Sequence, residues 1–155
     1  MDYIVRKITT EELPRLTELF DYNDISGMIE ENTRLLENGT DDIFILLRQE
    51  KLIGELHVRY ESEDQQEAAK GRRAYLYAFR IHKDHQGLGL GKFLLRTVIN
   101  LLSEANYSEF TVGVEDDNSR ALHIYQNFGF GEIIARKYEE YQGDGYEYNL
   151  YLKNN

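Results

Sequence analysis

A glycine-rich segment near the middle of the chain limits the possible folds most strongly. Residues 86–91 read QGLGLG and lie between an aromatic-rich stretch that looks buried and an amphipathic stretch. Glycine lets backbone N–H groups turn toward a ligand without a Cβ in the way. A helix that follows adds unpaired N–H groups and the positive end of its dipole. The pattern therefore predicts a strand, an anion-binding turn and a helix, with phosphate as the usual anion.

The hydrophobic periodicity on both sides of this segment predicts a mixed α/β sheet with helices on its faces. Strands are expected at residues 3–8, 43–48, 52–60, 74–81, 110–114, 132–138 and 146–152. Helices are expected through residues 13–20, 26–36, 93–105 and 118–128, with loops at 61–71 and 139–145. The strand, helix and strand over residues 74–114 imply one parallel pair joined by a right-handed crossover. Thr9 and Glu12 form a capping-box pattern at the start of the first helix.

Length and charge narrow the class of protein. A chain of 155 residues with 41% hydrophobic side chains predicts one domain, residues 1–155. Its formal charge of −10 argues against a general nucleic-acid or anionic-membrane partner. Residues 71–100 are the exception, with six basic side chains against one acidic side chain. This basic stretch includes the glycine-rich segment and matches the charge of a phosphate ligand, although ordinary solvated side chains explain the same pattern.

Several absences exclude other kinds of chemistry. The chain has no cysteine, which removes disulfides, thiolate nucleophiles and Cys-ligated metals. His82 and His85 without further ligands do not predict a metal site. No apolar run approaches the ~20 residues of a membrane span, and the first residues lack a signal-peptide pattern. We expect a cytoplasmic protein without a membrane partner, as a monomer or a homodimer.

Three phosphate-binding patterns compete for the glycine-rich segment. A dinucleotide fingerprint fails because Lys92 stands where its third glycine is required. A Walker A loop fails because Phe93, rather than serine or threonine, follows the Gly-Lys pair. The pattern that fits is Gln/Arg-x-x-Gly-x-Gly/Ala, met by Gln86, Gly89 and Gly91. A tight turn without a ligand is the alternative interpretation.

A second motif lies after the next expected strand. Residues 118–130, NSRALHIYQNFGF, resemble the Asn-x-x-Ala-x-x-x-Tyr-x-x-x-Gly-Phe signature of the GNAT superfamily of N-acetyltransferases. The glycine-rich segment is similar to the acyl-CoA loop of the same family, and the order of elements matches over nearly the whole chain. The resemblance implies a mostly antiparallel sheet of about seven strands with a parallel central pair. It also implies acetyl-CoA as cosubstrate and no metal.

The resemblance further implies roles for individual residues. Backbone amides in the glycine-rich loop would hold the pyrophosphate of coenzyme A; they belong to Gln86, Gly87, Leu88, Gly89, Leu90, Gly91 and Lys92. The backbone of Phe79, Arg80 and Ile81 would pair with the pantetheine arm like an added strand. Asn118 would contact the pantetheine region or cap the following helix, and both roles are compatible. Tyr125 would lie near the sulfur.

The implied chemistry is direct acetyl transfer from acetyl-CoA to an amine of a small molecule or peptide. A backbone N–H stabilises the oxyanion, and the phenol of Tyr125 protonates the departing thiolate. The alternative for Tyr125 is an ordinary core tyrosine on the apolar stripe of its helix. At the level of the whole chain, the alternative is a non-catalytic acyl-CoA sensor or interaction module with the same fold.

The general base and the acceptor are less constrained. The expected strand 74–81 carries no carboxylate, so the candidates are Glu55 and His57, on one face of a neighbouring strand, and Glu115 and Asp116. The last eighteen residues combine five tyrosines with several carboxylates. Acidic and aromatic side chains together favour a cationic amine as acceptor. An exposed hairpin with ordinary tyrosine content explains the same pattern.

Overall fold

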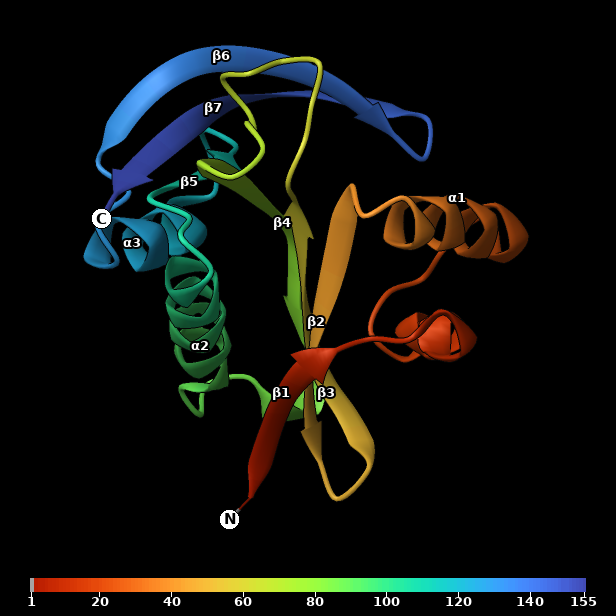
Figure 1. Cartoon of the computed structure of the whole chain (residues 1–155). Helices are drawn as coiled ribbons and strands as arrows, with labels where there is room; N and C mark the ends of the chain where they lie inside the picture. The colour runs from red at the N-terminus through yellow and green to blue at the C-terminus, as the bar shows by residue number, and fades with distance from the viewer. Residues whose placement is uncertain (1) are drawn as a thin grey trace.

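A seven-stranded sheet forms the centre of the computed structural model, which describes residues 2–155 (Figure 1). Its strands follow the order β1-β2-β3-β4-β5-β7-β6. Their bounds are Tyr3–Lys7 (β1), Asp41–Arg48 (β2), Lys51–Arg59 (β3), Arg73–Ile81 (β4), Glu109–Val114 (β5), Glu132–Tyr141 (β6) and Asp144–Asn154 (β7). Strands β4 and β5 run parallel, and all other neighbours within the described sheet run antiparallel. The predicted mixed sheet with one parallel pair is confirmed.

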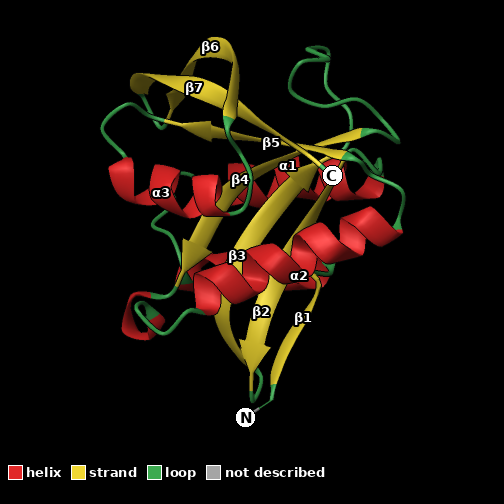
Figure 2. Ribbon diagram, turned by 90° about the vertical axis from the view of Figure 1, so that its left-hand side faces the viewer, coloured by secondary structure: helices red, strands yellow, loops and turns green. Residues whose placement is uncertain are grey.

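Helices cover both faces of this sheet, as Figures 1 and 2 show. Their bounds are Ile25–Glu37 (α1), Leu90–Glu104 (α2) and Ser119–Asn127 (α3), with 3₁₀ helices at Thr10–Glu18 (η1) and Lys83–His85 (η2). Helices α2 and α3 lie on one face, and η1 and α1 lie on the other. Each face buries its own apolar core. The period-2 pattern of β2 divides its residues between the two cores, with Phe44 toward α2 and Ile43 toward α1.

Three elements differ from the sequence-based expectation. The first helix is 3₁₀ rather than α, because Pro14 in its middle lacks the N–H that an α-helical turn needs. Residues 139–145 are not a loop, because β6 continues to Tyr141 and β7 resumes at Asp144. Between them Gln142 and Gly143 both have positive φ, as a two-residue hairpin turn requires. Helix α2 begins at Leu90, so the end of the glycine-rich segment supplies its first turn.

The parallel pair β4–β5 is shorter than the strands themselves. Their register runs from Arg73 opposite Glu109 to Leu76 opposite Val112. Beyond Leu76, β4 continues to Ile81 with β3 as its partner, and β5 pairs with β7. The facing edges of β4 and β5 are therefore unpaired over this last part of the described sheet. This opening determines where a ligand can reach the backbone.

A β-bulge lies in β4 beside this opening. Tyr77 pairs with His57, and Arg80 pairs with Glu55, so two residues of β4 oppose one residue of β3. Ala78, inside the bulge, has a φ of +48°, which is uncommon for a residue with a Cβ. Strained backbone of this kind concentrates at functional sites. The bulge reorients β4 where it leaves β5.

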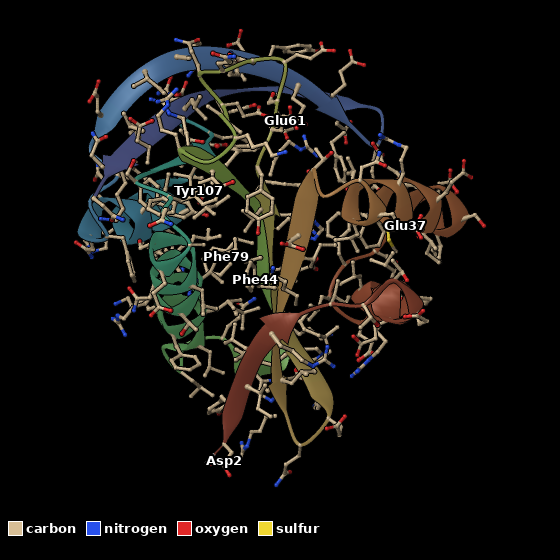
Figure 3. All side chains as sticks on the ribbon, viewed as in Figure 1. Asp2, Glu37, Phe44, Glu61, Phe79 and Tyr107 are labelled. Atoms are coloured by element: carbon tan, nitrogen blue, oxygen red, sulfur yellow. The ribbon has the colours of Figure 1, made fainter. Side chains whose placement is uncertain are left out.

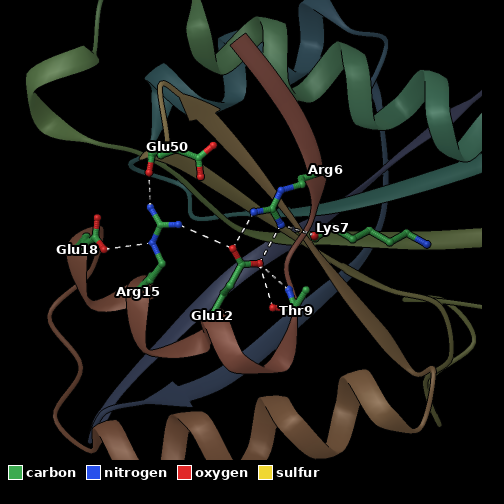
Figure 4. A network of polar contacts seen from close by, with 7 residues as sticks. All are labelled: Arg6, Lys7, Thr9, Glu12, Arg15, Glu18 and Glu50. Atoms are coloured by element: carbon green, nitrogen blue, oxygen red, sulfur yellow. Dashed lines mark hydrogen bonds and ion pairs between the residues drawn. The ribbon is translucent and has the colours of Figure 1, made fainter.

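A polar network joins the end of β1 to η1 and the β2–β3 turn (Figure 4). The predicted capping box is present, because Glu12 Oε1 accepts a hydrogen bond from the backbone N–H of Thr9 at 3.0 Å. Arg6 donates two hydrogen bonds to the same carboxylate, at 2.8 and 2.7 Å. Arg15 continues the network to the backbone of Glu50. The hydrogen bonds from Arg6 and Thr9 lower the pKa of Glu12 from 4.5 to about 2.

We expect Glu12→Gln to lower the free energy of unfolding by about 1–2 kcal/mol at neutral pH, because the charged acceptor is lost. The pKa of Glu12 is lower in the folded state than in the unfolded state. Its contribution is therefore complete above pH 4.5 and is lost as the pH falls toward 2. Urea unfolding at pH 7 and at pH 3 measures this, and Glu11→Gln, an exposed neighbour, is the control. If the free energies of unfolding of the wild type and Glu12→Gln differed equally at both pH values, the pH-dependent role of Glu12 would be contradicted.

Candidate active site

A cleft of about 1770 Å³ opens where β4 and β5 separate. Residues from both faces of the sheet line it, including Tyr77 and His57 on the α1 side and Phe79 and Tyr125 on the α2 side. Phe79 lies on the α2 side of β4 in Figure 3. The cleft therefore connects the two faces of the sheet through the opening. The unpaired edge of β4 is therefore part of the wall of the cleft.

The glycine-rich loop lies at one end of this cleft. Gly87 and Gly89 have φ values of +80° and +77°, a conformation that glycine adopts without steric cost. A Cβ built at either position meets nothing within 4 Å, so the loop is open on that side. Gly89 is also the N-cap of α2, where backbone N–H groups lack helical partners. The side chain of Gln86 donates a hydrogen bond to the carbonyl of Ile81 at 3.0 Å, which ties the loop to the end of β4.

The second sequence motif forms another part of the same cleft. Asn118 caps α3, and its side chain accepts a hydrogen bond from the N–H of Ala121 at 3.2 Å. Tyr125 is buried, with its ring 6.3 Å from that of Phe79 and 5.6 Å from that of Phe130. Both Asn118 and Tyr125 line the cleft. Burial raises the pKa of the Tyr125 phenol, so the hydroxyl keeps its proton at neutral pH.

The candidate bases occupy three different environments. Glu55 and His57 project together from β3 and are buried, with His57 Nε2 and Glu55 Oε1 2.6 Å apart. Glu115 also lines the cleft. Asp116 instead accepts two hydrogen bonds from Arg136, at 2.7 and 2.8 Å, and this contact lowers the pKa of Asp116. A carboxylate held charged by a partner is a weak proton acceptor, which leaves Asp116 the poorest of the four.

Contacts on the α1 side involve residues that the sequence analysis did not connect. The guanidinium of Arg80 lies 3.8 Å from the centre of the Phe20 ring and 3.4 Å from the hydroxyl of Tyr22. The backbone N–H of Asn23 donates a hydrogen bond to the side chain of Gln142, at the tip of the β6–β7 hairpin. In Figure 1 this hairpin arches over the sheet toward α1. These contacts join segments far apart in sequence, so no local pattern could have predicted them.

Four tyrosines and two glutamates line the cleft on the α1 side and come from β4, from this hairpin and from the loop ahead of β4. This group, called the tyrosine chamber, consists of Glu67, Tyr75, Tyr77, Glu139, Tyr146 and Tyr148. The rings of Tyr75 and Tyr77 stack at 5.4 Å, and Tyr146 donates a hydrogen bond to Glu139 at 3.2 Å. Burial raises the pKa of Glu67 and of all four tyrosines. The chamber offers aromatic faces and carboxylates to whatever enters it.

A metal cluster and a membrane-spanning helix are both absent from residues 2–155. Residues 2–155 contain no cluster of three or more His, Cys, Asp or Glu side chains that could hold a metal ion. Within the same residues, no helix has both the length and the apolar character to cross a membrane. His82 accepts a hydrogen bond from the backbone N–H of Asp84, a local contact within its turn.

The sequence pattern of the Acetyltransferase (GNAT) family matches residues 5–130. The chain belongs to this family. The match includes both the glycine-rich loop and the motif that begins at Asn118. The resemblance seen in the sequence is therefore confirmed for the greater part of this GNAT chain.

Curated relatives of this GNAT protein act on different substrates. This chain is 34% identical to L-amino acid N-acyltransferase MnaT of Escherichia coli K12 over 59 residues, which are 38% of this chain and 34% of that protein. It is 36% identical to spermine/spermidine N(1)-acetyltransferase of Bacillus subtilis 168 over 62 residues, 39% of this chain and 41% of that protein. The chain thus matches less than half the length of these relatives.

Solved structures share the fold over nearly the full length of this GNAT chain. Ribosomal-protein-alanine N-acetyltransferase of Brucella melitensis has a TM-score of 0.75 at 15% identity, over 97% of this chain and 99% of that one. A GNAT family acetyltransferase of Elizabethkingia anophelis with acetyl-CoA bound has a TM-score of 0.68 at 14% identity, over 98% of this chain and 97% of that one. At these identities the likeness establishes the fold.

Proposed function

We propose that this protein is an N-acetyltransferase that moves the acetyl group of acetyl-CoA directly to an amine. The observation that carries the proposal is the opening between β4 and β5, with the glycine-rich loop at its end. The unpaired edge of β4 offers backbone hydrogen bonds to an extended ligand, in the manner of an added strand. Acetyl-CoA combines an extended pantetheine arm with a pyrophosphate, and the family of this chain is that of acetyltransferases.

The donor lies along β4 and across the start of α2 in this proposal. Backbone amides of Gln86–Lys92 bind the pyrophosphate, aided by the positive end of the α2 dipole. The backbone of Phe79, Arg80 and Ile81 pairs with the pantetheine arm. The side chain of Gln86 bonds to the Ile81 carbonyl, and we assign the Ile81 N–H to the thioester. Asn118 caps α3 beside the arm.

Acetyl transfer needs a stabilised oxyanion and a proton for the leaving group. The N–H of Ile81 donates a hydrogen bond to the oxyanion that forms when the amine attacks the thioester carbonyl. Tyr125 gives its proton to the coenzyme A sulfur as the C–S bond breaks. The raised pKa of Tyr125 keeps the phenol protonated before the reaction, so its proton is present when the thiolate forms. No covalent enzyme intermediate is needed.

The acceptor enters from the α1 side, through the tyrosine chamber. A cationic amine is favoured there, because tyrosine faces attract cations and carboxylates form ion pairs with them. The overall charge of −10 supports the same class of substrate by steering cations toward the protein. One relative is named for spermine and spermidine, which belong to this class.

A calorimetric titration with acetyl-CoA and an assay for released thiol test the proposal together. We expect acetyl-CoA to bind, and thiol to appear faster with spermidine than with a monoamine of similar length, which carries a single positive charge. Binding without thiol release, for every amine tried, would instead identify an acyl-CoA sensor. Absence of binding would remove the assignment of the cosubstrate.

We expect Glu67→Gln to raise the KM for a cationic acceptor about tenfold, because one charge-assisted contact is lost. The KM for acetyl-CoA should not change, since Glu67 lies on the acceptor side of the sheet. Glu63→Gln is the matched control, because it removes the same charge from an exposed position in the same loop. Steady-state kinetics with spermidine measures both variants, and equal KM values in the two would contradict the role of Glu67.

A further inference from the structure

Two buried histidine nitrogens in the cleft wall, Nδ1 of His57 on β3 and Nδ1 of His85 in η2, have no hydrogen-bond partner among residues 2–155. His57 is 3% exposed, and its Nδ1 lacks a partner among residues 2–155, whereas its Nε2 lies 2.6 Å from Glu55 Oε1. A buried polar atom left unpaired costs about 1–3 kcal/mol, and such atoms in native proteins are few. His57 lines the cleft, so its ring belongs to the wall that a ligand would contact.

The contact with Glu55 determines which nitrogen of the neutral ring carries the hydrogen. An ionised carboxylate only accepts hydrogen bonds, so Nε2 is the donor, and Nδ1 keeps its lone pair. The other carboxylate oxygen, Glu55 Oε2, lies 3.5 Å from Arg80 Nη1. Glu55 is therefore held between a histidine and an arginine, while Nδ1 of His57 is free to accept a proton.

His57 also lies beside the β4 bulge, close to the residues that we propose bind the thioester. Its partner in the β3–β4 register is Tyr77, the residue just before the bulge, and the two rings are 5.1 Å apart. Phe79 is part of the bulge, and Ile81, whose N–H binds the thioester carbonyl in the function proposed above, follows two residues later. His57 is on the α1 side, and Tyr125 packs against Phe79 on the α2 side. A proton acceptor and a proton donor thus lie on opposite sides of the same opening.

We infer that His57 Nδ1 is the general base of the transfer and that Glu55 positions it. This inference rests on the proposed acetyl transfer. The amine nitrogen forms a bond to the thioester carbon and gives a proton to Nδ1. The C–S bond then breaks, its electron pair goes to sulfur, and the sulfur takes the proton of Tyr125. Water removes the proton from His57 and returns one to Tyr125, which restores both groups.

Other charged and titratable groups surround the pair and bear on any pH dependence. They are Arg59 on β3, Asp41 on β2, Tyr77 and Arg80 on β4, and Tyr22 ahead of α1. Arg59 and Asp41 satisfy each other through two hydrogen bonds of 3.0 Å, and Tyr77 bonds to both. Among these groups, His57 is the one with an unpaired acceptor in the cleft.

The first experiment removes the base. We expect His57→Gln to lower kcat about 100-fold with spermidine as acceptor, the lower end for general base catalysis, without changing the Kd for acetyl-CoA. Imidazole added to His57→Ala should restore part of the rate, because it fits the space left by the ring. His123→Gln, on the exposed side of α3, is the control. Wild-type kcat in a folded His57→Gln, or no rescue by imidazole, would overturn the role of His57.

The second experiment observes the proton directly. NMR of protein labelled with ¹⁵N at its four histidines distinguishes a protonated ring nitrogen from an unprotonated one. We expect Nδ1 of neutral His57 to be unprotonated in the wild type. We expect Glu55→Gln to shift protons onto Nδ1, because an amide can donate to Nε2, and to lower kcat. A proton on Nδ1 of the neutral ring in the wild type would overturn the inference.

Failure of this inference is distinguishable from failure of the proposed function. Fast acetyl transfer by a folded His57→Gln variant overturns the inference and leaves the proposed function intact. A wild-type protein that binds acetyl-CoA but transfers nothing to any amine overturns both.

Discussion

Gly89→Asp should weaken acetyl-CoA binding at least 100-fold while the protein still folds. Gly89 is the N-cap of α2 in the loop that we propose binds the pyrophosphate, so a carboxylate there would repel the ligand and block the amides. The fold should survive, because aspartate is a preferred N-cap residue and a side chain meets nothing within 4 Å. The φ of +77° adds a local cost of about 1–2 kcal/mol.

Isothermal calorimetry with acetyl-CoA measures this effect, and the far-UV circular dichroism spectrum checks the fold. Gly71→Asp is the matched control, because Gly71 has a φ of +78° and equally open surroundings but lies ahead of β4. The control should bind acetyl-CoA as the wild type does. Wild-type affinity in a folded Gly89→Asp variant would refute the assignment of the loop.

Tyr125→Phe should lower kcat about 100-fold or more and change the Kd for acetyl-CoA less than twofold. The substitution removes only the hydroxyl, and the ring contacts with Phe79 and Phe130 remain. Burial raises the pKa of Tyr125, so the acid form should persist to a higher pH than the value of about 10 for free tyrosine. We therefore expect no loss of wild-type kcat from this group below pH 10.

A change of leaving group separates an acid from a structural tyrosine. An acetyl thioester of a more acidic thiol needs less help from a proton donor, so the loss in Tyr125→Phe should shrink with it. Tyr151→Phe is the control, because Tyr151 is buried in the same core but does not line the cleft. An equal loss with both thioesters would show that the hydroxyl acts only through packing.

The local features of the sequence predicted most of the fold. The Thr9–Glu12 capping box, the helix cap at Asn118 and the turn at Gly89 each depend on residues that lie within a few positions of one another. The expected helix type was wrong at η1, where Pro14 favours a 3₁₀ helix over an α-helix. The expected boundaries were wrong at the 142–143 turn, which is shorter than its polar composition suggested.

The site was predictable where it depends on a single element. Alternation along β3 predicted that Glu55 and His57 share a face, and the structure brings them to 2.6 Å. Nothing local indicates that Arg80 packs on Phe20, because that contact depends on how η1 and β4 are brought together in the fold. No local pattern indicated the tyrosine chamber either, because it brings β4 together with the β6–β7 hairpin.

Transfer of a labelled acetyl group is the most direct test of the proposed function. The wild-type protein is incubated with acetyl-CoA labelled in the acetyl carbon, and with spermidine, and the products are separated and counted. We predict label on the amine, in an amount equal to the thiol released, and none on the protein. Bound acetyl-CoA that keeps its label with every amine tested, or label that remains covalently attached to the protein, would contradict direct acetyl transfer.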